Sequence, residues 1–94
     1  MPTWVIRADR RATSYEPLVA EIRDVAQSVA GLELRLVTQS AWNQAEPTPG
    51  FRDFSPIAWI SHVDGEALQW AAEELVDSLG WRVDVSAESE NVDA

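Results

Sequence analysis

The chain contains no cysteine and no lysine, and it has a single histidine. Without cysteine there is no disulfide bond and no thiolate metal site, so a redox function is not expected. Because the usual zinc sites need several His or Cys ligands, we expect no metal site and no cofactor. The four glycines are scattered at positions 31, 50, 65 and 80, whereas a phosphate-binding loop needs clustered glycines.

Long apolar runs are also lacking. No run approaches the ~20 residues needed to cross a bilayer, and the start of the chain, MPTWVIRADRR, has no apolar stretch of the kind found in a signal peptide. We therefore expect no membrane partner and a cytoplasmic location. The length of 94 residues and the apolar content of 46% are typical of one domain. We predict a single α+β domain over residues 1–86 and an acidic, disordered tail over residues 87–94.

Positive charge is scarce. Sixteen acidic residues face seven basic ones, all arginine, which gives a net charge of -9. Such a surface repels nucleic acid and attracts basic partners, and the small cluster of Arg7, Arg10 and Arg11 does not offset it. Two plainer interpretations stay open, because a GC-rich genome favours Arg over Lys and acidity by itself keeps proteins soluble.

The first half of the chain predicts a strand, a helix and a second strand. Residues 3–8 are aromatic and β-branched, which is typical of a strand. Apolar residues then recur at helical spacing over residues 14–30. Thr13 and Glu16 have the spacing of a capping box, and Gly31 is placed to end the helix. Leucines alternate with other side chains over residues 32–37, which predicts a half-buried strand.

The second half predicts a strand, a helix and a last strand. Residues 56–61 form a short apolar run that is typical of a buried strand. Asp64 can cap a helix that Gly80 ends, and residues 81–85 alternate as a strand does. The order β-α-β-β-α-β predicts a ferredoxin-like sandwich, which is an α+β fold with an antiparallel four-stranded sheet and two helices on one face.

The segment 39–55 is longer than a hairpin between the second and third strands needs. It contains Trp42, Phe51 and Phe54, and structureless loops of this length are often functional. The alternative is that the second strand continues to Trp42 and leaves a shorter turn after it.

Ser61, His62 and Asp64 are the residue types of a catalytic triad. Neighbouring residues of a strand point to opposite faces, so Ser61 and His62 cannot easily share a proton. A nucleophile flanked by glycines is also lacking. We therefore expect no catalytic residue and do not expect an enzyme.

Trp70 stands out in the second predicted helix. At 100° per residue it lies roughly 150° from the centre of the apolar stripe, among Glu66, Glu73, Glu74 and Asp77. Trp is enriched in interface hot spots, and acids around an aromatic ring suit a partner rich in Arg or Lys. The alternatives are that the indole covers a neighbouring loop of its own chain or serves a homodimer.

The sheet face turned away from the helices predicts a second surface. With Ile6 and Ile60 directed to the helices, the apolar residues on this face would be Val5, Val37, Ile57 and Trp59. The alternative is that the strand over residues 56–61 faces the other way. An apolar patch rimmed by charge usually marks an interface. Two such faces packed together would form a dimeric α/β barrel.

Three functions follow. The first is inhibition of a basic protein that handles nucleic acid, as in phage anti-defence proteins and toxin immunity proteins, where carboxylates imitate phosphates. The second is a dimeric α/β barrel that holds a small molecule or is an enzyme, with His62, Tyr15 or an Arg in its pocket. The third is a regulatory or structural subunit of a larger assembly. We favour the first and third, and their predicted partner-binding residues are Trp70, Glu66, Glu73, Glu74, Asp77, Trp42, Phe51 and Phe54.

Overall fold

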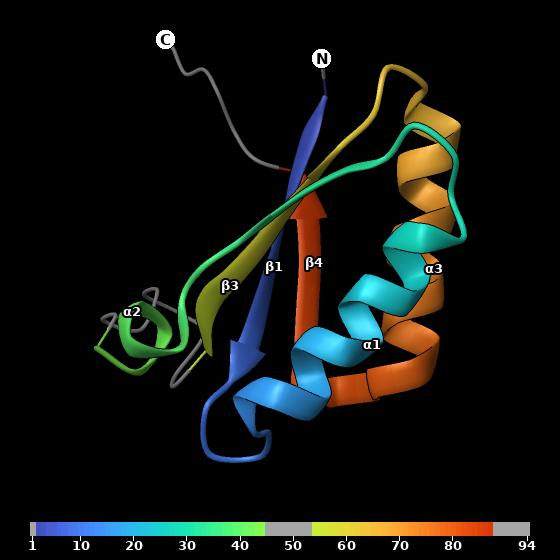
Figure 1. Cartoon of the computed structure of the whole chain (residues 1–94). Helices are drawn as coiled ribbons and strands as arrows, with labels where there is room; N and C mark the ends of the chain where they lie inside the picture. Colours follow the sequence, from blue (N-terminus) through green and yellow to red (C-terminus); the bar gives the residue numbers. More distant parts are fainter. Residues whose placement is uncertain (1, 45–53, 88–94) are drawn as a thin grey trace, which may run out of the picture.

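The computed structural model describes residues 2–44 and 54–87, which form an α+β fold with one four-stranded antiparallel sheet (Figure 1). Its elements are β1 (Thr3–Asp9), α1 (Tyr15–Gln27), β2 (Glu33–Leu36), α2 (Gln39–Gln44), β3 (Phe54–Ser61), α3 (Gly65–Leu79), a 3₁₀ turn η1 (Gly80–Arg82) and β4 (Val83–Ala87). The strand order is β2-β3-β1-β4, so β2 and β4 are the edges. Within the described residues, no helix is long and apolar enough to cross a membrane.

The core lies between the sheet and the two long helices. Helices α1 and α3 contact each other and lie side by side (Figure 1). The largest side chains that are almost completely buried come from β1, α1, β3 and α3, and they are Ile6, Ile22, Ile57, Ile60, Leu68 and Leu75. Burial of each such side chain contributes about 1.5–3 kcal/mol. The four predicted strands and both predicted helices are therefore present, and the antiparallel sheet is confirmed.

The ends of α1 differ from the prediction. Ser14 is the N-cap residue and its side chain makes no cap hydrogen bond, while the Thr13 hydroxyl donates to the Asp9 carbonyl oxygen at 2.7 Å. The predicted capping box is therefore wrong. The helix ends at Gln27, and Gly31 adopts its φ of +83° in the turn before β2 rather than as the helix cap.

Segment 39–55 was predicted to begin either as a structureless loop or as a continuation of the second strand to Trp42. Both predictions are wrong, because residues 39–44 form the short helix α2. The helix turns Trp42 inward, where 2% of its surface is exposed. The Trp42 Nε1–H donates to the Ser55 carbonyl oxygen at 3.3 Å, and its ring centroid lies 6.1 Å from that of Tyr15. Residues 45–53 and 88–94 lie outside the described residues. The predicted tail over residues 87–94 therefore lies outside them as well, except for Ala87, which belongs to β4.

Helix α3 begins and ends as predicted, but the last strand starts later. The Asp64 Oδ1 accepts from the Glu66 N–H at 3.0 Å. Gly80 has a φ of +64°, and its N–H donates to the Val76 carbonyl oxygen. The chain then makes η1 before β4 begins at Val83. Trp81 is therefore outside the sheet.

The outward face of the sheet is not the expected apolar patch. Val5 is 3% exposed, and the Arg35 guanidinium carbon lies 5.0 Å from the centroid of the Trp59 ring. Ile57 and Val37, which were predicted to face outward, instead belong to or pack against the core. The register between β1 and β3 shifts partway along the strands, and alternation alone does not reveal such a shift.

Replacement of Gly31 by Ala is expected to destabilise the fold by about 1–2 kcal/mol, because a residue with a Cβ is strained at positive φ. The added Cβ would also lie 3.2 Å from the His62 Nε2. Urea unfolding followed by circular dichroism measures the change. Gly65→Ala is the matched control, since nothing lies within 4 Å of its added Cβ. Equal loss of stability in the two variants would contradict the strain at Gly31.

Candidate functional site

Five neighbouring residues of α3 form the surface that we call the acidic face: Glu66, Trp70, Glu73, Glu74 and Asp77. All five are exposed, and the Trp70 indole keeps 45% of its surface in contact with solvent. The predicted exposure of Trp70 among carboxylates is therefore confirmed.

The buried side of α3 explains why Trp70 lies on the exposed side of the helix. Leu68, Ala71, Ala72 and Leu75 are buried and form one stripe along the helix. Because the stripe is held against the core, the helical period turns Trp70 away from it.

The charges of the acidic face are all of one sign. From Asp64 to Leu79 the chain has five carboxylates and no basic residue. The Gln69 amide donates to Glu73 at 3.2 Å. Within the described residues, the carboxylates of Glu66, Glu74 and Asp77 make no hydrogen bond or ion pair with another side chain. These groups are therefore available to a partner.

Asp77 lies in the last turn of α3, which contains no basic residue. The negative end of the helix dipole disfavours an acid at this position by about 0.3–1 kcal/mol. Stability of the helix therefore does not explain why an acid is there.

The other predicted partner-binding residues do not join this surface. The prediction for Trp42 is wrong, because its ring is buried and its N–H is bonded to Ser55. Phe54 is half-buried at the start of β3, and Phe51 lies outside the described residues.

Sequence reasoning missed the exposure of Trp81, whose side chain is 73% exposed in η1. Its alternation with Arg82 and Val83 resembles a strand. The signal against a strand was Gly80 directly before it, since a glycine with positive φ redirects the chain at the end of a helix.

Ser61, His62 and Asp64 form no proton relay. The Ser61 hydroxyl is bonded to the Thr3 hydroxyl at 3.1 Å. The His62 Nε2–H donates to the Ala30 carbonyl oxygen at 2.8 Å, and its Nδ1 accepts from the Asp64 N–H at 2.8 Å. The imidazole thus links the turn before β2 to the start of α3. Over residues 2–44 and 54–87, no three His, Asp or Glu side chains are grouped as metal ligands.

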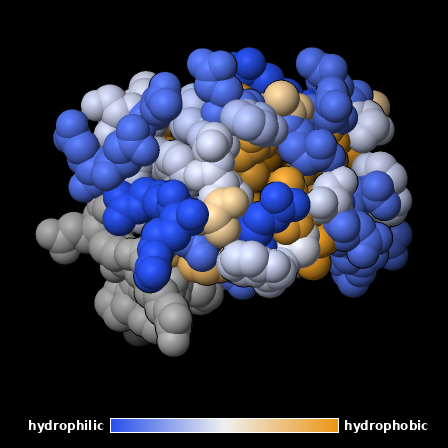
Figure 2. Space-filling view, turned by 90° about the horizontal axis from the view of Figure 1, so that it is seen from below, coloured by the Kyte–Doolittle hydropathy of each residue, from blue (hydrophilic) through white to orange (hydrophobic). Residues whose placement is uncertain are grey.

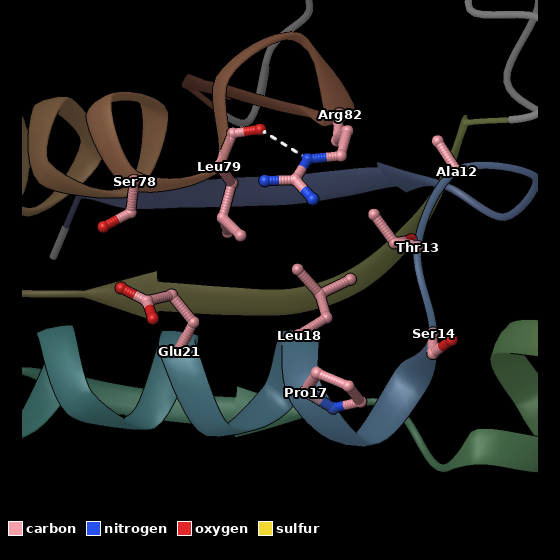
Figure 3. A pocket seen from close by; sticks show the side chains of 9 residues that line it. All are labelled: Ala12, Thr13, Ser14, Pro17, Leu18, Glu21, Ser78, Leu79 and Arg82. Carbon is pink, nitrogen blue, oxygen red and sulfur yellow. Dashed lines mark hydrogen bonds between the residues drawn. The ribbon is translucent and has the colours of Figure 1, made fainter.

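An open cleft of about 440 Å³ lies between the start of α1 and the end of α3 (Figure 3). The Arg82 Nε–H donates to the Leu79 carbonyl oxygen at 3.0 Å, and the guanidinium extends over the cleft toward Leu18 and Thr13. Glu21 lies on the opposite wall. Seen from this end, apolar surface shows between hydrophilic side chains (Figure 2). One base facing one acid gives the cleft little preference for either sign of charge.

Neither the models of known protein families nor the curated protein sequences give a match to this chain. The function is therefore inferred from the surfaces described above.

Trp42→Ala is expected to destabilise the fold by about 3–5 kcal/mol, because it empties a buried site. Trp70→Ala is expected to change the free energy of unfolding by less than about 1 kcal/mol, because the indole is nearly half exposed. Urea unfolding of both variants measures the difference. A Trp70→Ala variant as unstable as Trp42→Ala would mean that the Trp70 ring supports the fold.

Asp77→Asn is expected to stabilise the domain by about 0.3–1 kcal/mol, since it removes an acid from the negative end of the helix dipole. Thermal unfolding at low ionic strength measures this gain, which should shrink in salt. Glu66→Gln is the control with the opposite sign, because Glu66 lies in the first turn, where the dipole favours an acid. Stabilisation by both variants would indicate general charge repulsion instead of the dipole.

Proposed function

We propose that this chain is a protein-binding domain whose acidic face binds a basic protein that handles nucleic acid, and that it inhibits this partner. The observation that supports the proposal is the half-exposed Trp70 indole among four carboxylates on a helix without a base. Water solvates an exposed indole poorly, whereas a partner that covers it gains the burial of a large ring. An Arg of the partner can lie on the ring while neighbouring carboxylates bind its charge.

Single exposed ion pairs contribute little, about 0–1 kcal/mol each. The acidic face therefore supports binding in two separate ways. The summed field of its carboxylates attracts a basic partner over a distance and speeds association. The indole then supplies a central hot spot, which is where interfaces concentrate their affinity.

Imitation of nucleic acid is supported by the spacing of the carboxylates. Glu73 and Asp77 are four residues apart in α3, which is about 6 Å along the helix axis. Successive phosphates of one DNA strand are displaced by about 3.4 Å along the duplex axis and also turn around it, so this pair of carboxylates has about the separation of one phosphate step. A partner with a groove for phosphates can accept such a row of carboxylates. We also propose a cytoplasmic location, where this protein would meet a partner that handles nucleic acid.

A ferredoxin-like arrangement is proposed for the fold. It is supported by the strand order β2-β3-β1-β4 and by the paired helices α1 and α3, with α2 as an addition between β2 and β3. In this arrangement both long helices cover one face, and the acidic face is the outer surface of that helical layer.

The alternatives have less support. A dimeric barrel was expected to use His62 or Tyr15 in a ligand pocket, but both side chains are bonded to backbone groups, and the Tyr15 hydroxyl donates to the Val37 carbonyl oxygen at 2.7 Å. The cleft beside Arg82 is the remaining observation that favours a small ligand. A regulatory subunit would use the same acidic face as an inhibitor, so only the activity of the partner separates these two functions.

The experiment is capture of host proteins on the immobilised domain at low and high salt, with Trp70→Ala as the matched control. We expect a basic protein that is retained at low salt, released as ionic strength rises, displaced by duplex DNA, and weakened at least about tenfold by Trp70→Ala. The DNA- or RNA-dependent activity of this protein should fall when the domain is added.

A retained protein whose activity does not change would indicate a subunit rather than an inhibitor. Retention that is indifferent to salt and to Trp70→Ala would overturn the proposal. Binding of a small metabolite that is lost in Arg82→Ala, with no protein retained, would favour the cleft instead.

A further inference from the structure

Strand β4 is an edge of the sheet. It pairs with β1 along one side, and within the described residues no strand pairs with its other side. Natural edge strands are usually protected by lysine, proline or a bulge. The five residues of β4, VDVSA, contain neither lysine nor proline, and Asp84 is directed to Arg7 of β1, at 3.8 Å.

An apolar groove of about 310 Å³ runs beside this edge, between β4 and α3. Its apolar lining comes from Trp4, Ala72, Val76 and Val85. Val76 is 44% exposed, although it belongs to the same helix as the buried stripe. A strand edge that has no pairing strand among the described residues thus lies next to an apolar groove.

The charge at the groove selects the occupant. Glu73 and Asp77 line its helical side, and none of the described residues that line it is basic. Both residues also belong to the acidic face, so groove and face are continuous on α3. A partner that enters the groove must therefore bring positive charge together with an apolar side chain.

We propose that β4 receives an extended segment of the basic partner, which pairs as a fifth strand and places one apolar side chain in the groove. Alternate residues of a strand are about 6.6–6.8 Å apart, so an Arg two residues to either side of an apolar residue lies within side-chain reach of the rim of the groove. The segment has the pattern Arg-x-Val-x-Arg, in which Val enters the groove. The two Arg, about 13 Å apart along the strand, reach toward it from both ends to bind Glu73 and Asp77, which are about 6 Å apart along the helix axis. This inference rests on the proposed function, because it names the element of the basic partner that binds.

A second copy of the chain fits the edge less well. Pairing of two β4 strands would bring two acidic helices together, and like charges oppose this at low salt. Residues 88–94 contain three acids and no base, so they carry the wrong charge for the rim. The other edge, β2, has a groove that includes Arg23, and β2 itself carries both signs of charge.

The probe is the acetylated and amidated peptide TRTVTRT, titrated into the ¹⁵N-labelled full chain by NMR. Its control, TTRVRTT, has the same composition and charge but places both Arg on the strand face opposite to Val. Two further versions of TRTVTRT are N-methylated on odd or on even residues. Because alternate amides of a strand point to one edge, pairing predicts that one methylated version loses binding and the other retains it.

We expect TRTVTRT to bind at least about fivefold more tightly than TTRVRTT and to slow amide hydrogen exchange in β4. Glu73→Lys should weaken binding by about fivefold or more. Asp24→Lys is the matched control with the same change of charge, since Asp24 is an exposed acid of α1 that belongs neither to the groove nor to the acidic face, and we expect a change below about twofold. Val76→Ser should also weaken binding, whereas Val63→Ser, at another exposed site, should not.

Equal binding of both methylated peptides, or unchanged exchange in β4, would overturn strand pairing. If the peptide then shifts only signals around Trp70, the proposed function stands and this inference fails. If neither peptide binds, the inference fails as well, and the capture experiment decides the proposed function separately. Dimerisation that increases with salt in analytical ultracentrifugation would assign β4 to a second copy instead.

Discussion

The packing of α3 against the sheet is the contact on which the surface of this molecule depends. One side of the helix is buried through Leu68, Ala71, Ala72 and Leu75. Because the helical period is fixed, this burial determines which residues of α3 face the solvent. The backbone positions of Trp70 and its neighbouring acidic residues are therefore fixed by the same contacts that form the core. A binding surface carried on such a helix needs little ordering when a partner arrives, which lowers the entropic cost of association.

The same contact also determines the groove beside β4. With the stripe buried, Val76 on the flank of the helix remains 44% exposed and lines the groove together with Val85 of β4. The acidic face and the groove are thus two results of one packing arrangement. If a partner uses both, affinity arises from an indole, a strand edge and a charge field at once, and specificity arises from their fixed relative positions.

Much of the fold could be predicted, and the failures have definite physical causes. Helices α1 and α3 have periodic apolar stripes, and the same period predicted the exposure of Trp70. Trp42 could not be placed in this way, because the six residues of α2 are too few to show a period, and its burial depends on Tyr15 and Ser55 from other elements. Trp81 was misplaced because alternation continues through η1, although positive φ at Gly80 redirects the backbone.

The bond from the Trp42 indole to the Ser55 carbonyl oxygen joins two residues that are thirteen positions apart in the chain. It fastens Trp42 and Ser55, which stand at the two ends of this stretch, to the core. Loop closure becomes only about 0.6 kcal/mol more costly for each doubling of length. A longer stretch between these two anchors would therefore add little to the entropic cost of folding, so a change in chain length is tolerated here more readily than within the helices and strands.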